Sequence, residues 1–194
     1  YSPNKNMRKE NRGPILNPIR AFNINRLDNL NNFETGLSTT LGLDYKISQK
    51  DKKLNFSIAQ IINEQENKKM SSKSSLDEKL SDLVFTSNYE IRDKFNIEYN
   101  GAIDQNYNDI NYSNISTQFN FNPIKIDFDY LEENKHIGDQ KYFKTKLSFK
   151  KDSAEFNLET KKDLITNSSE FYNLSYEYIN DCLRAGLVYR REFY

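Results

Sequence analysis

Residues 115–130 read ISTQFNFNPIKIDFDY, a stretch in which alternate positions carry apolar or β-forming side chains. Successive side chains of a β-strand point to opposite faces, so a period of two predicts half-apolar strands. Asn122-Pro123 interrupts the period and predicts a tight turn between two such strands. The alternating positions are Ile115, Thr117, Phe119 and Phe121 before the turn, and Ile124, Ile126, Phe128 and Tyr130 after it.

The same period recurs from Phe33 to the end of the chain, and no helical pattern of comparable strength interrupts it. Ile110 and Tyr112 are out of phase with the residues that follow them, which predicts a β-bulge near Ser113. Residues 1–32 are rich in Asn, Arg, Lys and Pro and lack periodicity, so we expect a long loop there. The predicted fold class is all-β, an antiparallel up-and-down meander of about ten strands.

The composition argues against an ordinary protein core. Hydrophobic residues make up only 36% of the 194 residues and charged residues 29%, yet there are 13 Tyr and 13 Phe, too many for a disordered chain. A sheet with one apolar and one polar face reconciles these values. The 28 basic and 28 acidic residues balance, so no net field would attract nucleic acid.

The predicted connections alternate between short and long along the chain. Tight turns at residues 92–94, 122–123 and 180–181 alternate with longer links such as residues 63–82. Outer-membrane barrels sort their connections in this way, with short periplasmic turns and longer external loops, whereas a soluble meander has no reason to do so. The apolar runs are too short for membrane helices, but closed barrels span membranes with strands.

We therefore expect an incomplete piece of a transmembrane β-barrel, with residues 1–32 as an extracellular loop segment and residues 33–194 as barrel strands. The chain opens without an apolar signal segment, which for an exported protein suggests an internal fragment. On this interpretation the apolar face contacts membrane lipid. The predicted lipid-facing residues are Leu37, Leu41, Leu43, Leu54, Phe56, Ile58, Phe95, Ile97, Ile124, Ile126, Phe128, Leu147, Phe149, Phe156, Leu158, Leu174 and Leu187.

The opposite face carries charges whose sign alternates between neighbouring predicted strands. Such alternation suits cross-strand pairs on the wall of a wet lumen, although a simply solvated face fits the charges nearly as well. The predicted lumen-facing residues are Asp127, Asp129, Lys144, Lys146, Glu155, Glu159, Glu177, Arg184 and Arg190.

No catalytic, cofactor-binding or metal-binding residues are predicted. His136, the single histidine, is best interpreted as a solvated loop residue, because a metal site would need more ligands of its kind and a catalytic dyad a nearby nucleophile. Cys182, the single cysteine, follows the tight turn at residues 180–181, which the loop rule places on the periplasmic side. In that oxidising compartment it is either a paired thiol or an incidental small residue.

Two stretches resemble the C-terminal barrel of LptD (OstA), the outer-membrane family that assembles lipopolysaccharide. AFNINRLDNLNNFETGLSTTLGLDYKI, residues 21–47, resembles a family element in which an Asn- and Arg-containing loop with a late acidic residue enters a strand bearing Gly and Thr. YINDCLRAGLVYRREF, residues 178–193, is similar to the family's cysteine-containing turn and penultimate strand. Residues 81–104 fit its repeating hairpins.

The resemblance implies a lipopolysaccharide translocon in the outer membrane of a Gram-negative bacterium. It also implies an LptE-like lipoprotein inside the barrel and a periplasmic Lpt bridge that acts through an N-terminal domain not seen in this sequence. By the same resemblance Cys182 would bond to a cysteine of that periplasmic region, and one final strand would follow residue 194. Some members carry two adjacent cysteines where this chain has one.

The expected function is thus to form barrel wall and lumen for lipopolysaccharide insertion into the outer leaflet, without enzymatic chemistry. A porin or substrate-specific channel is the alternative, and it would lack a periplasmic domain ahead of the barrel. A soluble β-sheet binding protein is a third possibility, and it would partition to the aqueous phase without detergent. A barrel enzyme such as a lipase would have to use His136 as its base.

Overall fold

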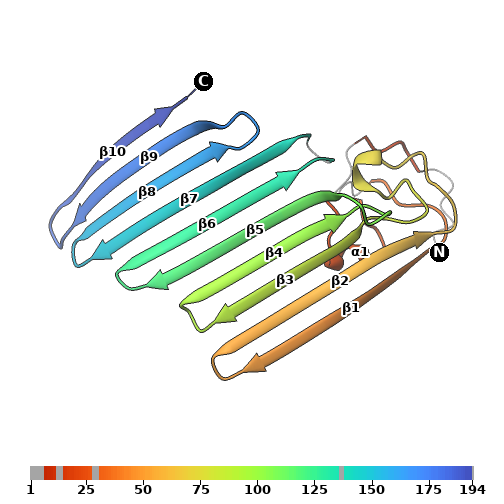
Figure 1. The fold of residues 1–194 in the computed structure, drawn as a ribbon, viewed down its shortest axis with the longest axis horizontal. Helices are drawn as coiled ribbons and strands as arrows, with labels where there is room; N and C mark the ends of the chain where they lie inside the picture. Colours follow the sequence, from red (N-terminus) through yellow and green to blue (C-terminus); the bar gives the residue numbers. More distant parts are fainter. Residues whose placement is uncertain (1–6, 12–14, 28–30, 136–137, 194) are drawn as a thin grey trace.

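Ten antiparallel strands form one sheet in the computed structural model, which describes residues 7–11, 15–27, 31–135 and 138–193. Each strand pairs with its neighbours in chain order, from β1 to β10 (Figure 1). The predicted all-β up-and-down meander is confirmed. The strands are β1 (Ser38–Gln49), β2 (Lys52–Asn63), β3 (Leu83–Ile91), β4 (Phe95–Ile103), β5 (Ile110–Phe121), β6 (Ile124–Glu133), β7 (Gln140–Lys151), β8 (Ala154–Asp163), β9 (Ser168–Ile179) and β10 (Arg184–Glu192).

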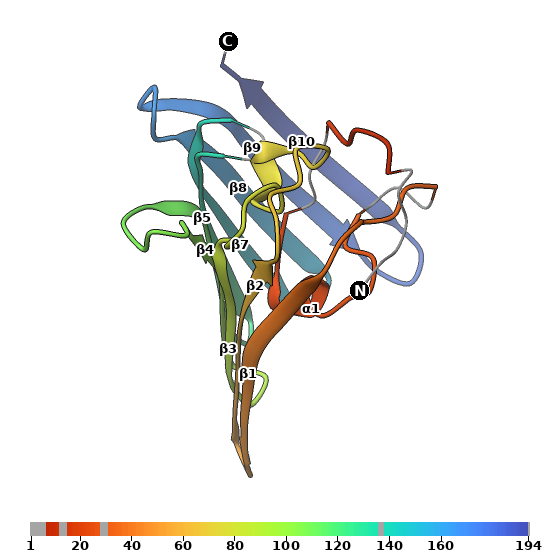
Figure 2. The ribbon, with the colours of Figure 1, turned by 90° about the vertical axis from the view of Figure 1, so that its right-hand side faces the viewer.

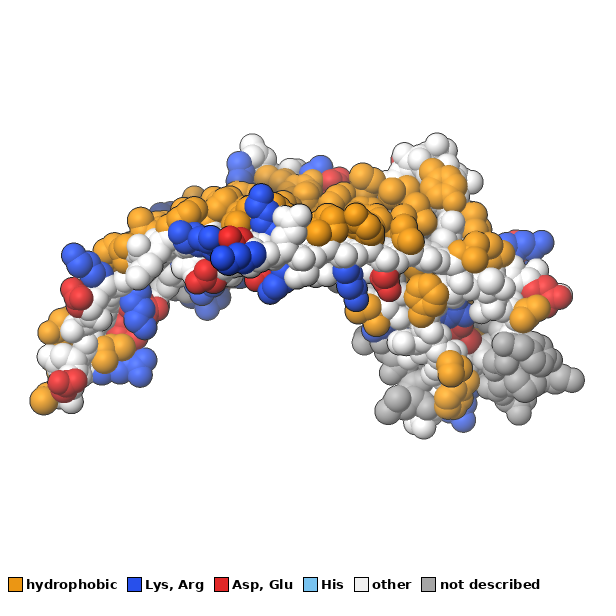
Figure 3. Space-filling view, turned by 90° about the horizontal axis from the view of Figure 1, so that it is seen from below, with side chains coloured by type: hydrophobic (Ala, Val, Ile, Leu, Met, Phe, Trp, Pro, Cys, Tyr) orange, Lys and Arg blue, Asp and Glu red, His pale blue; other side chains and the backbone are white. Residues whose placement is uncertain are grey.

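The sheet is an open arch. Among the described residues, β1 pairs only with β2 and β10 only with β9, so the two edge strands do not meet. Figure 2 shows the strong twist that carries β10 away from the direction of β1. Figure 3 shows hydrophobic side chains along the convex side of the arch, while its concave side is mostly polar and charged. We call these two sides the convex face and the concave face.

The register departs from regular pairing at two places. Ala102 pairs with Tyr112 but Ile103 pairs with Ile110, so Asn111 is an extra residue in β5. The irregularity predicted near Ser113 therefore occurs at Asn111. A second shift, which the sequence pattern did not indicate, leaves Glu170 extra in β9. Bulges of this kind increase local twist and help a sheet to curve.

The period of two extends back to Phe33 in the sequence, but β1 begins at Ser38. The Leu37 carbonyl still accepts a hydrogen bond from the Glu64 amide, just after β2, at 2.9 Å, but residues 32 and 34 bond to the N-terminal part of the chain. Asn32 is buried and exchanges hydrogen bonds with the backbone of Arg8, at 3.0 Å in each direction. Glu34 is buried against Arg26. Side-chain bonds to the N-terminal part of the chain thus take over ahead of Leu37, where regular pairing with β2 ends.

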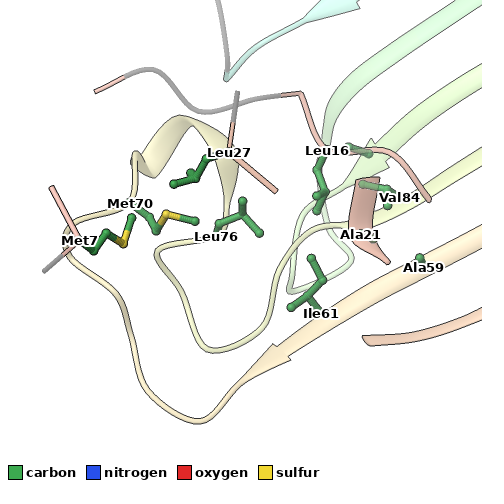
Figure 4. Close-up of a cluster of buried hydrophobic side chains, with 10 residues drawn as sticks. Met7, Leu16, Ala21, Leu27, Ala59, Ile61, Met70, Leu76 and Val84 are labelled. Carbon is green, nitrogen blue, oxygen red and sulfur yellow. The ribbon is translucent and has the colours of Figure 1, made fainter. Parts of the chain in front are cut away.

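Residues 7–11 and 15–27, here called the inner segment, pack on the concave face of the first strands. They contain the one-turn helix α1 (Pro18–Ala21), which Asn17 caps by accepting a hydrogen bond from the Arg20 amide at 2.7 Å. Figure 4 shows how side chains of this segment meet those of β2, β3 and the β2–β3 connection, which holds the 3₁₀ turn Ser72–Ser74. The buried cluster is Met7, Leu16, Ala21, Leu27, Ala59, Ile61, Met70, Leu76, Val84 and Ala102.

A row of small side chains makes room for the inner segment. The register aligns Gly42, Ala59, Val84 and Ala102 across β1 to β4 on the concave face. A Cβ atom at Gly42 would lie 2.7 Å from Cζ of Phe22, closer than real contacts allow. The Thr40 hydroxyl, on the same face, donates a hydrogen bond to the Ala21 carbonyl at 2.9 Å. The inner segment therefore packs directly against this row of small side chains, which we call the seat.

A buried ion pair fixes the end of the inner segment to the start of β1. Nε of Arg26 donates to both carboxylate oxygens of Glu34, at 2.9 and 2.8 Å, and Nη2 donates to the Ser38 hydroxyl at 2.8 Å. Arg26 is 6% and Glu34 8% exposed. Burial raises the pKa of Glu34 even though the charge and hydrogen bonds of Arg26 lower it. Neither charge could be buried here without the other.

We predict that Glu34→Ala destabilises the full-length protein by about 3–5 kcal/mol, because it leaves the Arg26 guanidinium buried and unpaired. Denaturant unfolding of the protein in lipid vesicles measures the change. Glu90→Ala is the matched control, since it breaks the solvent-exposed Lys53–Glu90 pair, 3.3 Å long, and should cost only about 0–1 kcal/mol. Equal losses for the two variants would contradict the anchoring role.

Candidate functional site: the two faces of the sheet

The convex face gathers the apolar side chains of all ten strands. Register pairs such as Leu43 with Ile58, Ile126 with Leu147 and Leu158 with Leu174 join apolar residues from strand to strand. Every predicted lipid-facing residue within the strands lies on this face. Leu37 lies just before β1 and is 46% exposed. Among the described residues no helix or second sheet covers the face, because strands contact only their sheet neighbours and α1 contacts the opposite side.

An aromatic ladder crosses the middle of the convex face. The ring centroids of Phe95 and Phe119 lie 5.1 Å apart, those of Phe119 and Phe128 6.3 Å, and those of Phe128 and Phe143 5.8 Å. The ladder thus links β4, β5, β6 and β7. Cross-strand aromatic pairs of this type stabilise a sheet beyond the area that they bury. They do so here without any packing layer above them.

The concave face carries the predicted lumen-facing residues. Register pairs place Asp127 opposite Lys146 and Asp129 opposite Lys144, as the alternating signs suggested. Nζ of Lys144 lies 2.6 Å from a carboxylate oxygen of Glu159 on β8. The register also puts Glu155, Glu177, Arg184 and Arg190 on this face. All nine predicted residues are therefore on one side of the sheet, opposite to the apolar set.

Two register pairs on the concave face join like charges, and each charge has another partner. Lys144 lies opposite Lys161, whose Nζ lies 2.8 Å from Glu170 and 4.2 Å from the ring centre of Tyr142. Glu155 lies opposite Glu177, which pairs with Arg184 in β10. Glu155 itself lies 3.7 Å from Nζ of Lys150. The face is thus a network in which charges balance locally.

The two ends of the sheet differ in their connections. Short turns such as residues 50–51, 92–94, 122–123 and 152–153 lie at one end, and the longer connections, including residues 64–82, lie at the other (Figure 1). Cys182 lies at the short-turn end, in the β9–β10 connection, with an exposed and free thiol. The Asn180 side chain holds this turn by accepting hydrogen bonds from the amides of Cys182 and Leu183, at 3.0 and 2.7 Å.

The apolar residues on the concave face were not identified from the sequence. Ala59, Ile61, Val84 and Ala102 occupy positions that the period of two assigns to the polar side, and all are buried. A signal for them exists, because apolar residues become consecutive at the corresponding ends of three strands: Ile61-Ile62, Leu83-Val84-Phe85 and Ala102-Ile103. Loss of alternation in adjacent strands indicates a place where both faces are covered.

Several cavities lie on the concave side, among them one of about 340 Å³ between residues 15–19 and β2 to β5. Two others contain buried or predicted charged residues. The first, of about 360 Å³, lies between the inner segment and the start of β1, with Phe22, Arg26, Glu34, Ser38 and Thr40 in its wall. The second, of about 220 Å³, is an open polar groove over β4 to β7. Its wall includes Gln118, Asp127, Asp129, Lys144 and Lys146. The predicted lumen-facing residues thus contribute to the second cavity, whereas the first is formed by residues that sequence reasoning did not group together.

His136 lies outside the described residues. In the part of the chain that is described, no group of three or more His, Cys, Asp or Glu side chains is arranged to hold a metal ion. No described helix has the length and apolar character needed to cross a bilayer.

Comparison with known families identifies the chain. The family model described as LptD, LPS transport system D, matches residues 19–162, which is most of the sequence. A comparison with curated proteins gives no match. The matched range extends from α1 to β8, so it includes part of the inner segment, the Arg26–Glu34 pair and most of the two-faced sheet. The chain therefore belongs to the LptD family of outer-membrane proteins that act in lipopolysaccharide transport and assembly.

Proposed function

We propose that this sheet is part of the wall of an outer-membrane translocon that inserts lipopolysaccharide into the outer leaflet. The observation that carries the proposal is an uncovered apolar face opposite a charged and polar face, in a chain of the LptD family. In water the convex face would be an exposed patch far larger than soluble monomers tolerate. Hydrocarbon against it removes that cost, as in membrane barrels.

The concave face is suited to the polar part of an amphiphile. Its acidic, basic, amide and hydroxyl groups can exchange hydrogen bonds with sugars, and its charges balance locally through pairs such as Lys144–Glu159. An unbalanced wall would hold an anionic glycolipid too tightly or repel it. The proposed role of this wall is to lower the free-energy barrier for moving the sugars across the membrane while the acyl chains stay in contact with lipid.

The ends of the sheet support an orientation. We assign the short-turn end to the periplasm and the long-connection end to the cell exterior, following the asymmetry of known barrels. The inner segment joins the long-connection end, where the Glu10 amide donates to the Lys69 carbonyl at 2.8 Å. The inner segment would then enter the barrel from its external end. An LptE-like lipoprotein would occupy lumen space beside the inner segment, and a periplasmic Lpt bridge would deliver lipopolysaccharide from below.

Depletion of the full-length protein tests the function. We expect lipopolysaccharide to accumulate inside the envelope and its surface level, measured by labelling intact cells, to fall. Re-expression of the protein should restore surface labelling. A porin or substrate-specific channel would instead change solute uptake and leave lipopolysaccharide delivery intact, so normal surface labelling after depletion would overturn the proposal.

Two adjacent positions of β9 separate the roles of the faces. Leu174 lies on the convex face and Ser175 on the concave face at the centre of the strand. We predict that Leu174→Arg destabilises the membrane-inserted protein by about 2–4 kcal/mol, the cost of a cation at the bilayer midplane. Ser175→Arg, the matched control, should be tolerated because a wet lumen solvates the charge. Vesicle unfolding measures both; a greater loss for Ser175→Arg would reverse the assignment of faces.

The exposed thiol of Cys182 gives a prediction about covalent assembly. We propose that it forms a disulfide with a cysteine of the periplasmic region, because it lies at the end assigned to that oxidising compartment. Non-reducing electrophoresis of the full-length protein should show a mobility shift that reductant removes. Cys182→Ser should abolish the shift, and an unchanged pattern in this variant would refute the pairing.

A further inference from the structure

The cavity between the inner segment and the start of β1 has features that the sheet alone does not require. Its volume of about 360 Å³ falls in the range of small-molecule sites. One wall comes from the inner segment and the other from residues 34–40, so it exists only because the segment is docked. From this geometry we infer that the cavity binds a single sugar ring of a glycolipid, an inference that rests on the proposed function.

Hydroxyl and amide groups line the polar side of the cavity. Ser38 accepts a hydrogen bond from Nη2 of Arg26, which leaves its own proton free to donate. Thr40 donates to the Ala21 carbonyl, which leaves its lone pairs free to accept. A donor and an acceptor on neighbouring positions of one strand face suit two adjacent hydroxyls of a sugar, each of which both donates and accepts.

A buried donor in the same wall lacks a partner. Nη1 of Arg26 makes no hydrogen bond within the described residues, although the side chain is 6% exposed. Nη1 has almost no accessible surface, so it lies behind the cavity wall and an occupant of the cavity would not contact it directly. The guanidinium is otherwise committed to Glu34 and Ser38, so its orientation is fixed before any ligand arrives.

The apolar side of the cavity completes the match to a sugar. Phe22 is 57% exposed and Ile24 98% exposed, both on the otherwise polar side of the arch. The ring of Phe22 is placed by contact with Gly42, where no side chain larger than hydrogen fits. One face of a pyranose carries C–H groups whose partial positive charge is attracted to an aromatic face.

Charge decides between a neutral sugar and a phosphate. The carboxylate of Glu34 neutralises Arg26 at a separation of 2.8–2.9 Å, so this wall has no net positive charge. Phosphate recognition normally uses uncompensated Arg or Lys groups. The preferred occupant is therefore an uncharged ring with vicinal hydroxyls.

Binding of released core oligosaccharide to the full-length protein in detergent tests the inference. The probe is lipopolysaccharide freed of lipid A by mild acid hydrolysis, and titration calorimetry measures the dissociation constant. We expect Asn23→Trp, which places an indole in the cavity wall, to weaken binding at least about tenfold. Ser38→Ala, which removes one hydroxyl, should weaken it about two- to tenfold.

Ile19→Trp is the matched control, since Ile19 is 81% exposed on the same segment and does not line this cavity. It should bind as the wild type does. A thermal melt of each variant checks folding, and Ser38→Ala decides the outcome if Asn23→Trp is unstable. Unchanged binding in the cavity variants, absence of binding in the wild type, or displacement of the oligosaccharide by inorganic phosphate would each overturn the inference. Surface delivery after re-expression tests the proposed function separately.

Discussion

The structure depends on one constraint: each strand separates its apolar and polar side chains, and nothing in the described chain covers the apolar side. A soluble sheet buries such a face on helices or on a second sheet. Here Leu43 is 61% and Leu187 76% exposed, and no packing layer of the described chain covers the aromatic ladder from Phe95 to Phe143. Hydrocarbon against this face would remove the cost of its exposure, which agrees with membership in an outer-membrane family.

The alternation fails in one region, and the failure explains the inner segment. At the long-connection ends of β2, β3 and β4 the concave face turns apolar, with Ile61, Val84 and Ala102 almost fully buried. Polar side chains there would have left Leu16 and Ala21 without apolar partners. The small side chains aligned with Gly42 let the segment approach the strands closely. The concave face is thus divided into a dry seat over the first strands and a wet surface over the later ones.

Much of the sheet could be predicted from the sequence because the period of two is local information. The bounds of β3 and β4 follow directly from the apolar runs at Leu83–Ile91 and Phe95–Ile103 and the turn between them. The inner segment could not be predicted in this way, since its partners are distant in sequence and it has no period of its own. The Arg26–Glu34 pair shows the limit: both residues fall in the stretch that resembles the LptD family, but their mutual burial depends on how residues 32–37 leave the ladder. The two register irregularities could be predicted only in part. A change of phase in the apolar alternation predicted a bulge near Ser113, which occurs at Asn111, but the pattern gave no sign of the bulge at Glu170.

The buried pair also bears on how the inner segment finds one position. Apolar contacts between Leu16, Ala21 and the seat are weakly directional, so they alone would permit sliding along the face. A bidentate guanidinium–carboxylate pair has a narrow geometry and is costly to bury unpaired, so it admits a single docking register. Because Nη2 of Arg26 also bonds Ser38, the first residue of β1, that register is transmitted to the edge strand of the sheet. The ion pair therefore fixes one docking position of the inner segment, which apolar burial alone could not do. The pair lies where the inner segment and the start of β1 enclose a cavity.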